Sequence, residues 1–338
     1  MIATALVAFA RAAHRVGASQ GLVCPTPPSP IGCWEQLRPV GSGGFPAEPG
    51  SNDRPSWTPG KIPVTLFPVV AFGGDLWMVS QTHSYSSSDG LIWSQHDKVD
   101  WGERIGQSFV FFRDRLWMLG GLDYRTRRPL NDVWSSADGV RWQPVGVAAW
   151  PERKGAAVVV FKGRLWLLGG TREVNSRFEP VRMLNDVWSS EDGIRWSQAA
   201  PAAPWKPRDQ PRVAMLGDAL YLLGGSGVAD VWRSTDGEIW TQLAAEAPWG
   251  GRQGFGAEAF DGRLWVFGGW IGPPTNALND VWFSPNGATW TRLAEHAPWG
   301  PRSPRSVVFR DRLWIFSGKH TGGSESWGGD VWVMPAAR

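Results

Sequence analysis

The chain has 338 residues, and its 34 basic and 31 acidic side chains leave a formal net charge of +3. A charge this small gives no electrostatic indication of a nucleic-acid partner. Gly, Pro and Trp are abundant, at 42, 27 and 24 residues, and together with short apolar runs they favour strands and turns over helices. No apolar stretch approaches the roughly 20 residues that are needed to span a bilayer.

Residues 1–32 precede the repeated part of the chain and are predicted to be an N-terminal tail or a degenerate signal segment. The opening MIATALVAFA is apolar, and VGA at residues 16–18 resembles a cleavage site, but no basic residue precedes the apolar run and Arg11 interrupts it. Cys24 and Cys33 are the only cysteines, and they are either a disulfide pair or two incidental thiols. We expect an exported location, periplasmic or extracellular, with a cytoplasmic one as the alternative.

Six similar units follow, each about 40 to 55 residues long, which is a period typical of repeat arrays and propellers. In each unit an apolar run ends in a large residue, and an aromatic residue stands five positions later, after a tight polar turn. This spacing predicts two antiparallel strands, the second usually ended by a Gly-Gly pair. The large residues are Phe72, Phe112, Phe161, Leu216, Phe260 and Phe309, and the aromatic residues are Trp77, Trp117, Trp166, Tyr221, Trp265 and Trp314. The pairs are Gly120-Gly121, Gly169-Gly170, Gly224-Gly225 and Gly268-Gly269, whereas the first and sixth units have Ser80-Gln81 and Ser317-Gly318.

A third strand follows a loop of variable length, and in the first five units its aromatic residue is followed eight positions later by a Trp. Asp-Gly, or Asn286-Gly287 in the fifth unit, stands between the two. Because Asp-Gly tolerates positive φ, it predicts a type I′ turn and a fourth strand, so each unit is a four-stranded meander. The third-strand aromatic residues are Tyr85, Trp134, Trp188, Trp232, Trp282 and Trp332, and the later ones are Trp93, Trp142, Trp196, Trp240 and Trp290.

The sixth unit lacks a fourth strand of its own, since the sequence ends at DVWVMPAAR. A matching segment stands near the other end, where CWEQL at residues 33–37 resembles IWTQL at 239–243. A strand at 34–37 that pairs with residues 331–333 would close the ring and leave no incomplete blade. We therefore predict an all-β, six-bladed propeller of four-stranded antiparallel blades, formed as a single domain by residues 33–335.

These features resemble the kelch family of β-propellers, as in galactose oxidase and the kelch-type adaptor proteins. The resemblance covers residues 34–334 and rests on the Gly-Gly pairs, the aromatic residue of NDVW, the fourth-strand Trp and the Arg that precedes each first strand. It implies that the loop between blades lies on the same face as the loop between the second and third strands, near the central channel. Adaptor proteins of the family use Arg there to bind acidic peptides.

The repeated Trp residues are predicted to fill the space between neighbouring blades, and sugar stacking is the alternative for Trp outside the repeat. Each loop between blades adds an Arg that either faces a ligand or pairs with the Asp of DVW in its own blade. The first unit has lost both partners, with Gly60 and His83 in their places, and this joint loss favours pairing. The Arg residues are Arg104, Arg153, Arg208, Arg252 and Arg302, and the Asp residues are Asp132, Asp186, Asp230, Asp280 and Asp330.

The loops after the second strands differ in length and chemistry, and insertions of this kind commonly carry function in repeat proteins. Their basic and aromatic side chains suit an anionic small molecule, a glycan or an acidic peptide, whereas solvated surface charge is the alternative. The predicted ligand-binding residues are Tyr124, Arg125, Arg127 and Arg128 in the second unit, Arg172, Arg177 and Arg182 in the third, Trp270 in the fifth, and Lys319, His320 and Trp327 in the sixth.

The catalytic residues are unknown from sequence, and Glu258 and Glu173 are the two candidates. Glu258 stands on a first strand where the other units have Val70, Val110, Val159, Ala214 and Val307. A carboxylate in this apolar ring must be paired, hydrated or protonated, and pairing near Arg252 is favoured over a role as general base. Glu173, with Arg177 in the same loop, comes closest to the Glu and Arg that sialic-acid mutarotases use.

Two functions follow from these observations. The favoured one is a non-catalytic propeller that binds an anionic ligand or protein partner on the face with the loops described above. The alternative is a sugar-acting enzyme that resembles sialic-acid mutarotases, with a carboxylate and Arg site on the same face. A copper site like that of galactose oxidase is not expected, because the chain has three Tyr and no adjacent His pair. His83 and His320 are too few for a metal site, so we expect no metal, no cofactor and no nucleic acid.

Overall fold

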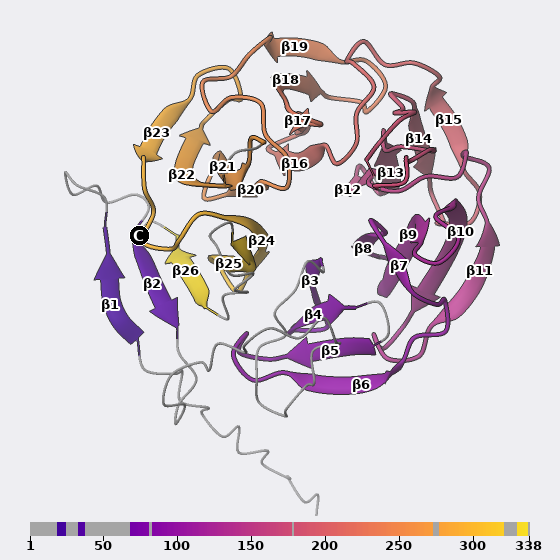
Figure 1. The fold of residues 1–338 in the computed structure, drawn as a ribbon, viewed down its shortest axis with the longest axis horizontal. Coiled ribbons are helices and arrows are strands. Elements are labelled where there is room, and N and C mark those ends of the chain that lie inside the picture. The colour runs from indigo at the N-terminus through magenta and orange to yellow at the C-terminus, as the bar shows by residue number, and fades with distance from the viewer. Residues whose placement is uncertain are drawn as a thin grey trace, which may run out of the picture.

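The computed structural model describes residues 19–24, 33–37, 68–80, 83–177, 179–272, 277–320 and 330–336. Within these ranges the regular elements are β-strands, and six antiparallel sheets stand as blades around one central axis (Figure 1). The predicted all-β, six-bladed propeller is therefore confirmed. The described part of the chain contains no helix with the length and apolar character of a membrane span.

The first three blades follow one another along the chain. Blade 1 consists of β3 (Val69–Phe72), β4 (Asp75–Val79), β5 (His83–Ser87) and β6 (Ser94–Lys98). Blade 2 consists of β7 (Arg104–Ile105), β8 (Ser108–Phe112), β9 (Arg115–Asp123), β10 (Pro129–Ser136) and β11 (Gln143–Val147). Blade 3 consists of β12 (Ala157–Phe161), β13 (Arg164–Leu168), β14 (Val187–Ser190) and β15 (Ser197–Ala200).

The last three blades complete the ring. Blade 4 consists of β16 (Arg212–Leu216), β17 (Ala219–Gly225), β18 (Val228–Ser234) and β19 (Thr241–Ala244). Blade 5 consists of β20 (Gly256–Phe260), β21 (Arg263–Trp270), β22 (Ala277–Ser284) and β23 (Thr291–Ala294). Blade 6 consists of β24 (Arg302–Phe309), β25 (Arg312–His320), β26 (Val331–Pro335), β2 (Trp34–Leu37) and β1 (Ser19–Val23).

Blade 6 joins the two ends of the chain, as the sequence predicts. Strand β2 pairs antiparallel with β26, so that Glu35 lies opposite Val333 and Leu37 opposite Val331. Figure 1 shows the indigo β2 beside the yellow β26 at the edge of the ring. The sequence did not predict β1, which adds a fifth strand by pairing with β2. A disulfide between Cys24 and Cys33 links the end of β1 to the start of β2.

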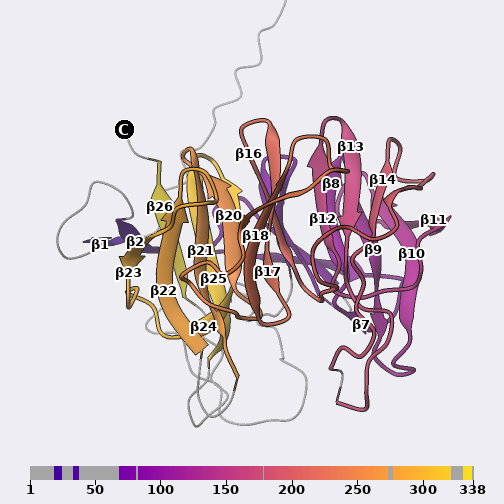
Figure 2. The ribbon, with the colours of Figure 1, turned by 90° about the horizontal axis from the view of Figure 1, so that it is seen from above.

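The innermost strands of all six blades surround the centre and run roughly along the ring axis, whereas the outermost strands lie along the rim (Figures 1 and 2). In an antiparallel meander the first strand begins, and the second strand ends, at the same end of the sheet. The loops that enter a blade and the loops between its second and third strands therefore share one face of the ring. We call this face the loop face. The described parts of the loops in which the sequence predicts ligand-binding residues lie on this face.

The repeated Trp residues pack between blades, as predicted. Trp117 of blade 2 belongs to one buried cluster with Leu165, Trp188 and Trp196 of blade 3. Its ring also lies against Gly193 of blade 3, where an added Cβ would stand 2.5 Å from the Trp117 ring. The same contact joins the second strand of other blades to the glycine of the next blade, at Trp77 and Gly139, Trp166 and Gly237, Tyr221 and Gly287, and Trp314 and Gly90. The glycine of the Asp-Gly pair is therefore required by inter-blade packing.

The type I′ turn predicted at Asp-Gly is wrong. In blade 2, Gly139 has a φ of 75° but Asp138 is not among the residues with positive φ, whereas a type I′ turn needs both. The carboxylate of Asp138 instead accepts hydrogen bonds from the backbone N–H groups of Val140 and Arg141, at 3.0 and 2.8 Å. This side-chain contact stabilises a longer loop. Two consecutive positive φ angles occur in the other hairpin, at Arg113 and Asp114 between β8 and β9.

Candidate functional site

The five Arg residues that enter the blades are each paired with the Asp of the same blade. In blade 3, Arg153 Nη1 and Nη2 donate to the two carboxylate oxygens of Asp186, both at 2.7 Å. The Arg153 and Asp186 side chains are 1% and 7% exposed. The other pairs are Arg104 with Asp132, Arg208 with Asp230, Arg252 with Asp280, and Arg302 with Asp330. We call these five ion pairs the braces.

In blade 3 the remaining polar groups of the brace are also engaged. Arg153 Nη1 donates to the carbonyl of Gly169 at 2.9 Å, and the indole Nε1 of Trp188 donates to Asp186 at 2.7 Å. Gly169 has a φ of 61°, and an added Cβ there would stand 3.1 Å from the carbonyl oxygen of Arg208. The Gly-Gly pair thus holds the carbonyl against the buried guanidinium. We conclude that the brace residues stabilise the blade. They are not available to a ligand, because a ligand would have to displace these contacts.

Blade 1 lacks the Asp of a brace. His83 stands there on β5, and burial, followed by the charge of Lys98, lowers the pKa of its imidazole. The corresponding Gly60 lies outside the described residues. His83, His96 and Lys98 border an open cavity of about 580 Å³ at the outer edge of the blade. Within the described ranges, no group of three His, Cys, Asp or Glu side chains is arranged to hold a metal ion.

The loop between β9 and β10 presents four predicted ligand-binding residues on the loop face. Asp123 fixes this loop, because its carboxylate accepts the backbone N–H groups of Arg125 and Thr126 at 2.9 and 2.7 Å. The hydrogen bond from the Thr126 backbone is the main cause that lowers the pKa of Asp123. The side chains of Tyr124, Arg125, Arg127 and Arg128 are all exposed. The backbone is therefore ordered while the charged side chains face solvent.

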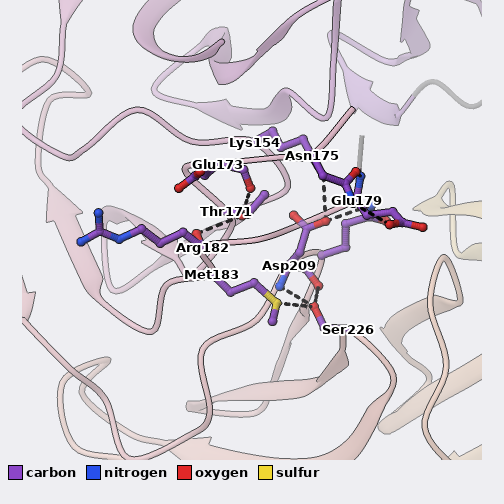
Figure 3. Close-up of polar contacts among 10 residues, drawn as sticks. Lys154, Thr171, Glu173, Asn175, Glu179, Arg182, Met183, Asp209 and Ser226 are labelled. Carbon is purple, nitrogen blue, oxygen red and sulfur yellow. Dashed lines mark hydrogen bonds and ion pairs between the residues drawn. The ribbon is translucent and has the colours of Figure 1, made fainter. Parts of the chain in front are cut away.

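The longer loop between β13 and β14 forms an irregular hairpin that carries three further predicted residues. Thr171 anchors it, since its hydroxyl oxygen lies 2.9 Å from the carbonyl oxygens of both Glu173 and Arg182 and can donate its proton to either of them. At the tip, the Asn175 carboxamide oxygen accepts the backbone N–H of Arg177 at 2.9 Å. Arg177 and Arg182 are exposed and Arg172 is half-buried. Figure 3 shows the Arg182 guanidinium pointing away from the neighbouring polar residues.

The remaining predicted residues belong to blades 5 and 6. Trp270 ends β21, is half-buried, and pairs through its backbone with Gln253 of the entering loop. Lys319 and His320 are the last two residues of β25, which ends at the loop face. The structure describes their backbone and not their side chains. Trp327 lies outside the described residues.

A buried ion pair that the sequence did not predict joins blades 3 and 4 on the loop face. Lys154 Nζ lies 2.8 Å from Asp209 Oδ2, and both side chains are 6% exposed (Figure 3). Burial raises the pKa of Asp209, while the Lys154 charge opposes this shift. Lys154 and Asp209 directly follow the brace residues Arg153 and Arg208 in the sequence. Because the two residues occupy the same position in the repeats of adjacent blades, the sequence could have predicted that they are neighbours.

Glu258 lies on β20 at the central channel, but its partners differ from the prediction. Ser306 of β24 donates its hydroxyl to Glu258 Oε1 at 2.8 Å, and Arg212 of β16 supplies the nearby positive charge. Arg252, the predicted neighbour, is bound in the brace to Asp280. Burial is the main cause that raises the pKa of Glu258 to about 7. Glu173, the other carboxylate candidate, is exposed on the blade 3 loop.

Comparisons with known proteins agree with this architecture. A family model described as the Kelch motif matches residues 251–296, which span blade 5. No curated protein sequence matches the chain. Among solved structures 427 chains match, so similarity at this level identifies a fold and no single function. One of them, "Structure of YjhT", has a TM-score of 0.64 at 17% identity and covers 80% of this chain and 94% of that chain. The chain is a six-bladed β-propeller that carries a Kelch motif at residues 251–296.

Proposed function

We propose that the propeller is a non-catalytic binding module that takes an anionic ligand on its loop face. One observation supports this proposal above the others: the Arg residues of this face fall into two classes. Those in the braces are at most 3% exposed and bind a carboxylate of their own blade. Those on the loops of blades 2 and 3 are mostly exposed, and among the described residues Arg125, Arg128, Arg177 and Arg182 form no ion pair.

The exposed Arg residues are not needed to close the hairpins that carry them. In blade 4 the same connection is made by Ser226 and Gly227 alone, since Gly225 pairs with Val228. The longer loops of blades 2 and 3 therefore add side chains beyond the requirements of the fold. Guanidinium groups on an ordered backbone suit the carboxylates of an acidic sugar or peptide, because they form charge-assisted and often bidentate hydrogen bonds.

A stabilisation screen tests the proposal with matched pairs of probes. N-acetylneuraminate, glucuronate and a Glu-rich peptide should raise the melting temperature, because ligands that bind only the native state stabilise it. N-acetylmannosamine, glucose and a Gln-rich peptide of equal length serve as neutral controls. The effect of the acidic probes should fall as salt rises from low to physiological concentration. Equal shifts from the acidic and neutral members of each pair would contradict the proposal.

A sugar-acting enzyme remains the alternative, and one observation favours it. Glu173 and Arg177 lie on the same hairpin, whose backbone is fixed by Thr171 and by the side chain of Asn175. A carboxylate and a guanidinium on one ordered loop are the groups that the resemblance to sialic-acid mutarotases calls for. Acceleration of anomer exchange in N-acetylneuraminate, followed by NMR and lost in Glu173→Gln, would establish the enzyme in place of the binding module.

We also propose that the protein is exported. The Cys24–Cys33 disulfide supports this location, because disulfides persist in oxidising compartments and are rare in the cytosol. Recovery of the protein only in the cytosolic fraction, with both thiols free to react with a maleimide, would contradict it.

A further inference from the structure

The fourth strands of five blades share an irregularity at their outer edge. In blade 4, Trp232 lies opposite Gln242 and Val231 opposite Ala244, so Leu243 of β19 is an extra residue without a counterpart on β18. An extra residue of this kind is a β-bulge. Strands β6, β11, β15 and β23 also show a register shift where they pair with the third strand of their blades. Bulges protect exposed edges, because they twist the edge away from regular pairing with another chain.

Strand β2 lacks this protection, although it takes the place of the fourth strand in blade 6. Its residues 35–37 pair in unbroken register with residues 333–331 of β26. Its sequence, WEQL, contains neither proline nor lysine, which are other common ways to protect an edge. The charge of Glu35 is compensated by Arg312, whose Nη1 lies 3.6 Å from Glu35 Oε2. Among the fourth strands that the structure describes, β2 is therefore the one with a regular edge.

Strand β1 carries the irregularity that β2 lacks. Ser19 lies opposite Leu37, and Leu22 lies opposite Glu35. Three residue steps along β1, from 19 to 22, thus match two steps along β2, from 37 to 35, so β1 contains one extra residue. Figure 1 shows β1 on the outer side of β2, at the rim of the ring. In all six blades the outermost strand therefore carries a register shift, and β1 covers the regular edge of β2.

The Cys24–Cys33 disulfide holds this cover in place. It joins the residue that follows β1 to the residue that precedes β2. Val23, the residue of β1 whose side chain the structure describes, is 42% exposed, so its packing contributes little to holding the strand. Cys24 is exposed, and a dithiol reductant can reach the bond. The reaction gives two protein thiols, and the dithiol is oxidised to its own disulfide.

We propose that β1 keeps β2 from pairing with the β2 of a second copy of this chain, and that loss of the Cys24–Cys33 disulfide opens this edge for dimerisation. A regular, uncovered edge presents unpaired backbone groups that act as a template for another strand. Two identical edges can pair antiparallel about a two-fold axis, which gives a closed dimer. The contacts come from the backbone, so no complementary side-chain surface is required. This interface does not depend on the anionic ligand proposed above.

A full-length protein in which β1 cannot pair tests the dimer. Leu22→Pro and Val23→Pro remove the backbone N–H groups of β1, and Cys24→Ser with Cys33→Ser remove the disulfide. We call this protein the uncovered variant. In sedimentation velocity its mass should rise with concentration to twice that of the oxidised wild type, which is the reference at each concentration. If the uncovered variant keeps the wild-type mass throughout, the proposal is wrong.

The matched control restores a bulge to β2. Insertion of one alanine directly after Leu37 of the uncovered variant gives WEQLA, which corresponds to WTQLA at residues 240–244 of blade 4. Leu37 then takes the position of the bulged Leu243. This protein should have the mass of the wild type, because its outer edge is irregular again. Association that persists after the insertion would mean that another surface forms the dimer, and the β2 interface would be rejected.

Hydrogen exchange in the wild type tests the disulfide without any substitution. In dithiothreitol the amides of β1 should exchange roughly tenfold faster or more than in the oxidised protein, because β1 can then leave β2 by local opening. The amides of β19, which belongs to blade 4, should exchange at the same rate in both states and serve as the internal control. Equal rates for β1 in the two states would show that the disulfide does not hold the cover, and would overturn the proposal even if the variants fail to fold.

Discussion

Removing residues 1–38 is expected to unfold the propeller, whereas removing residues 1–30 should leave a folded protein of moderately lower stability. The longer deletion takes away β2, whose Trp34 and Leu37 are 2% and 1% exposed. Trp34 belongs to the cluster between blades 5 and 6, and Leu37 to the cluster between blades 6 and 1. Loss of a buried Trp costs about 3–5 kcal/mol and loss of a buried Leu about 2–5 kcal/mol, while the whole stability of a domain is only about 5–15 kcal/mol.

The shorter deletion serves as the control for this experiment. It removes β1 and Cys24 but keeps β2, and β1 contributes an outer strand whose Val23 is exposed. Thermal unfolding of both truncated proteins, followed by near-ultraviolet circular dichroism, gives the comparison. The melting temperature of Trp34→Ala in the full chain should lie between those of the two truncated proteins. Equal melting temperatures for the two truncations would mean that β2 does not close the ring.

Asp186→Ala is expected to destabilise the protein by about 3–5 kcal/mol, the usual cost of breaking a buried ion pair by removing one partner. Its Arg153 partner is 1% exposed and would keep a buried charge without a carboxylate. Arg153→Ala should also destabilise, since Asp186 then loses two hydrogen bonds of 2.7 Å. The double variant should cost less than the sum by about 1–3 kcal/mol, because the two groups interact directly.

An exposed ion pair in the same blade provides the matched control. Arg164 and Glu191 are 44% and 65% exposed, so Glu191→Ala should change the free energy of unfolding by less than about 1 kcal/mol. Chemical denaturation of the wild type and the four variants measures all of these values. Strict additivity of Arg153→Ala and Asp186→Ala would show that the pair contributes no coupling, and the structural role assigned to the braces would fail.

The architecture was predictable because each blade repeats the contacts that hold it together. The aromatic positions and the Gly-Gly pairs recur at the same place in successive units. The first unit lacks both the Arg and the Asp of a brace, and this joint loss indicated that the two residues pair. Closure by Trp34–Leu37 was predictable for the same reason, since that segment matches the fourth strand of other units. Strand β1 has no counterpart in any unit, so the repeat contained no signal for it.

The features that were missed depend on contacts between blades or on local side-chain hydrogen bonds. Lys154 and Asp209 are 55 residues apart, and their pairing follows from the spacing of neighbouring blades and not from a period within one. Arg212, the positive charge near Glu258, comes from a different blade, so no pattern within one unit marks this contact. The Asp-Gly turn was misassigned because the Asp138 carboxylate binds the backbone beyond the glycine.

The most direct test of the binding function compares loop Arg residues with an exposed Arg on the opposite face. Arg195, in the loop between β14 and β15, is 91% exposed and lies at the other end of its blade. Titrating a Glu-rich peptide by calorimetry, we expect Arg128→Ala and Arg177→Ala each to weaken binding by about 1–3 kcal/mol, the scale of a charge-assisted hydrogen bond. Their melting temperatures should stay unchanged, and Arg195→Ala should bind like the wild type. Wild-type affinity in both loop variants, or an equal loss in Arg195→Ala, would contradict an anion-binding site on the loop face.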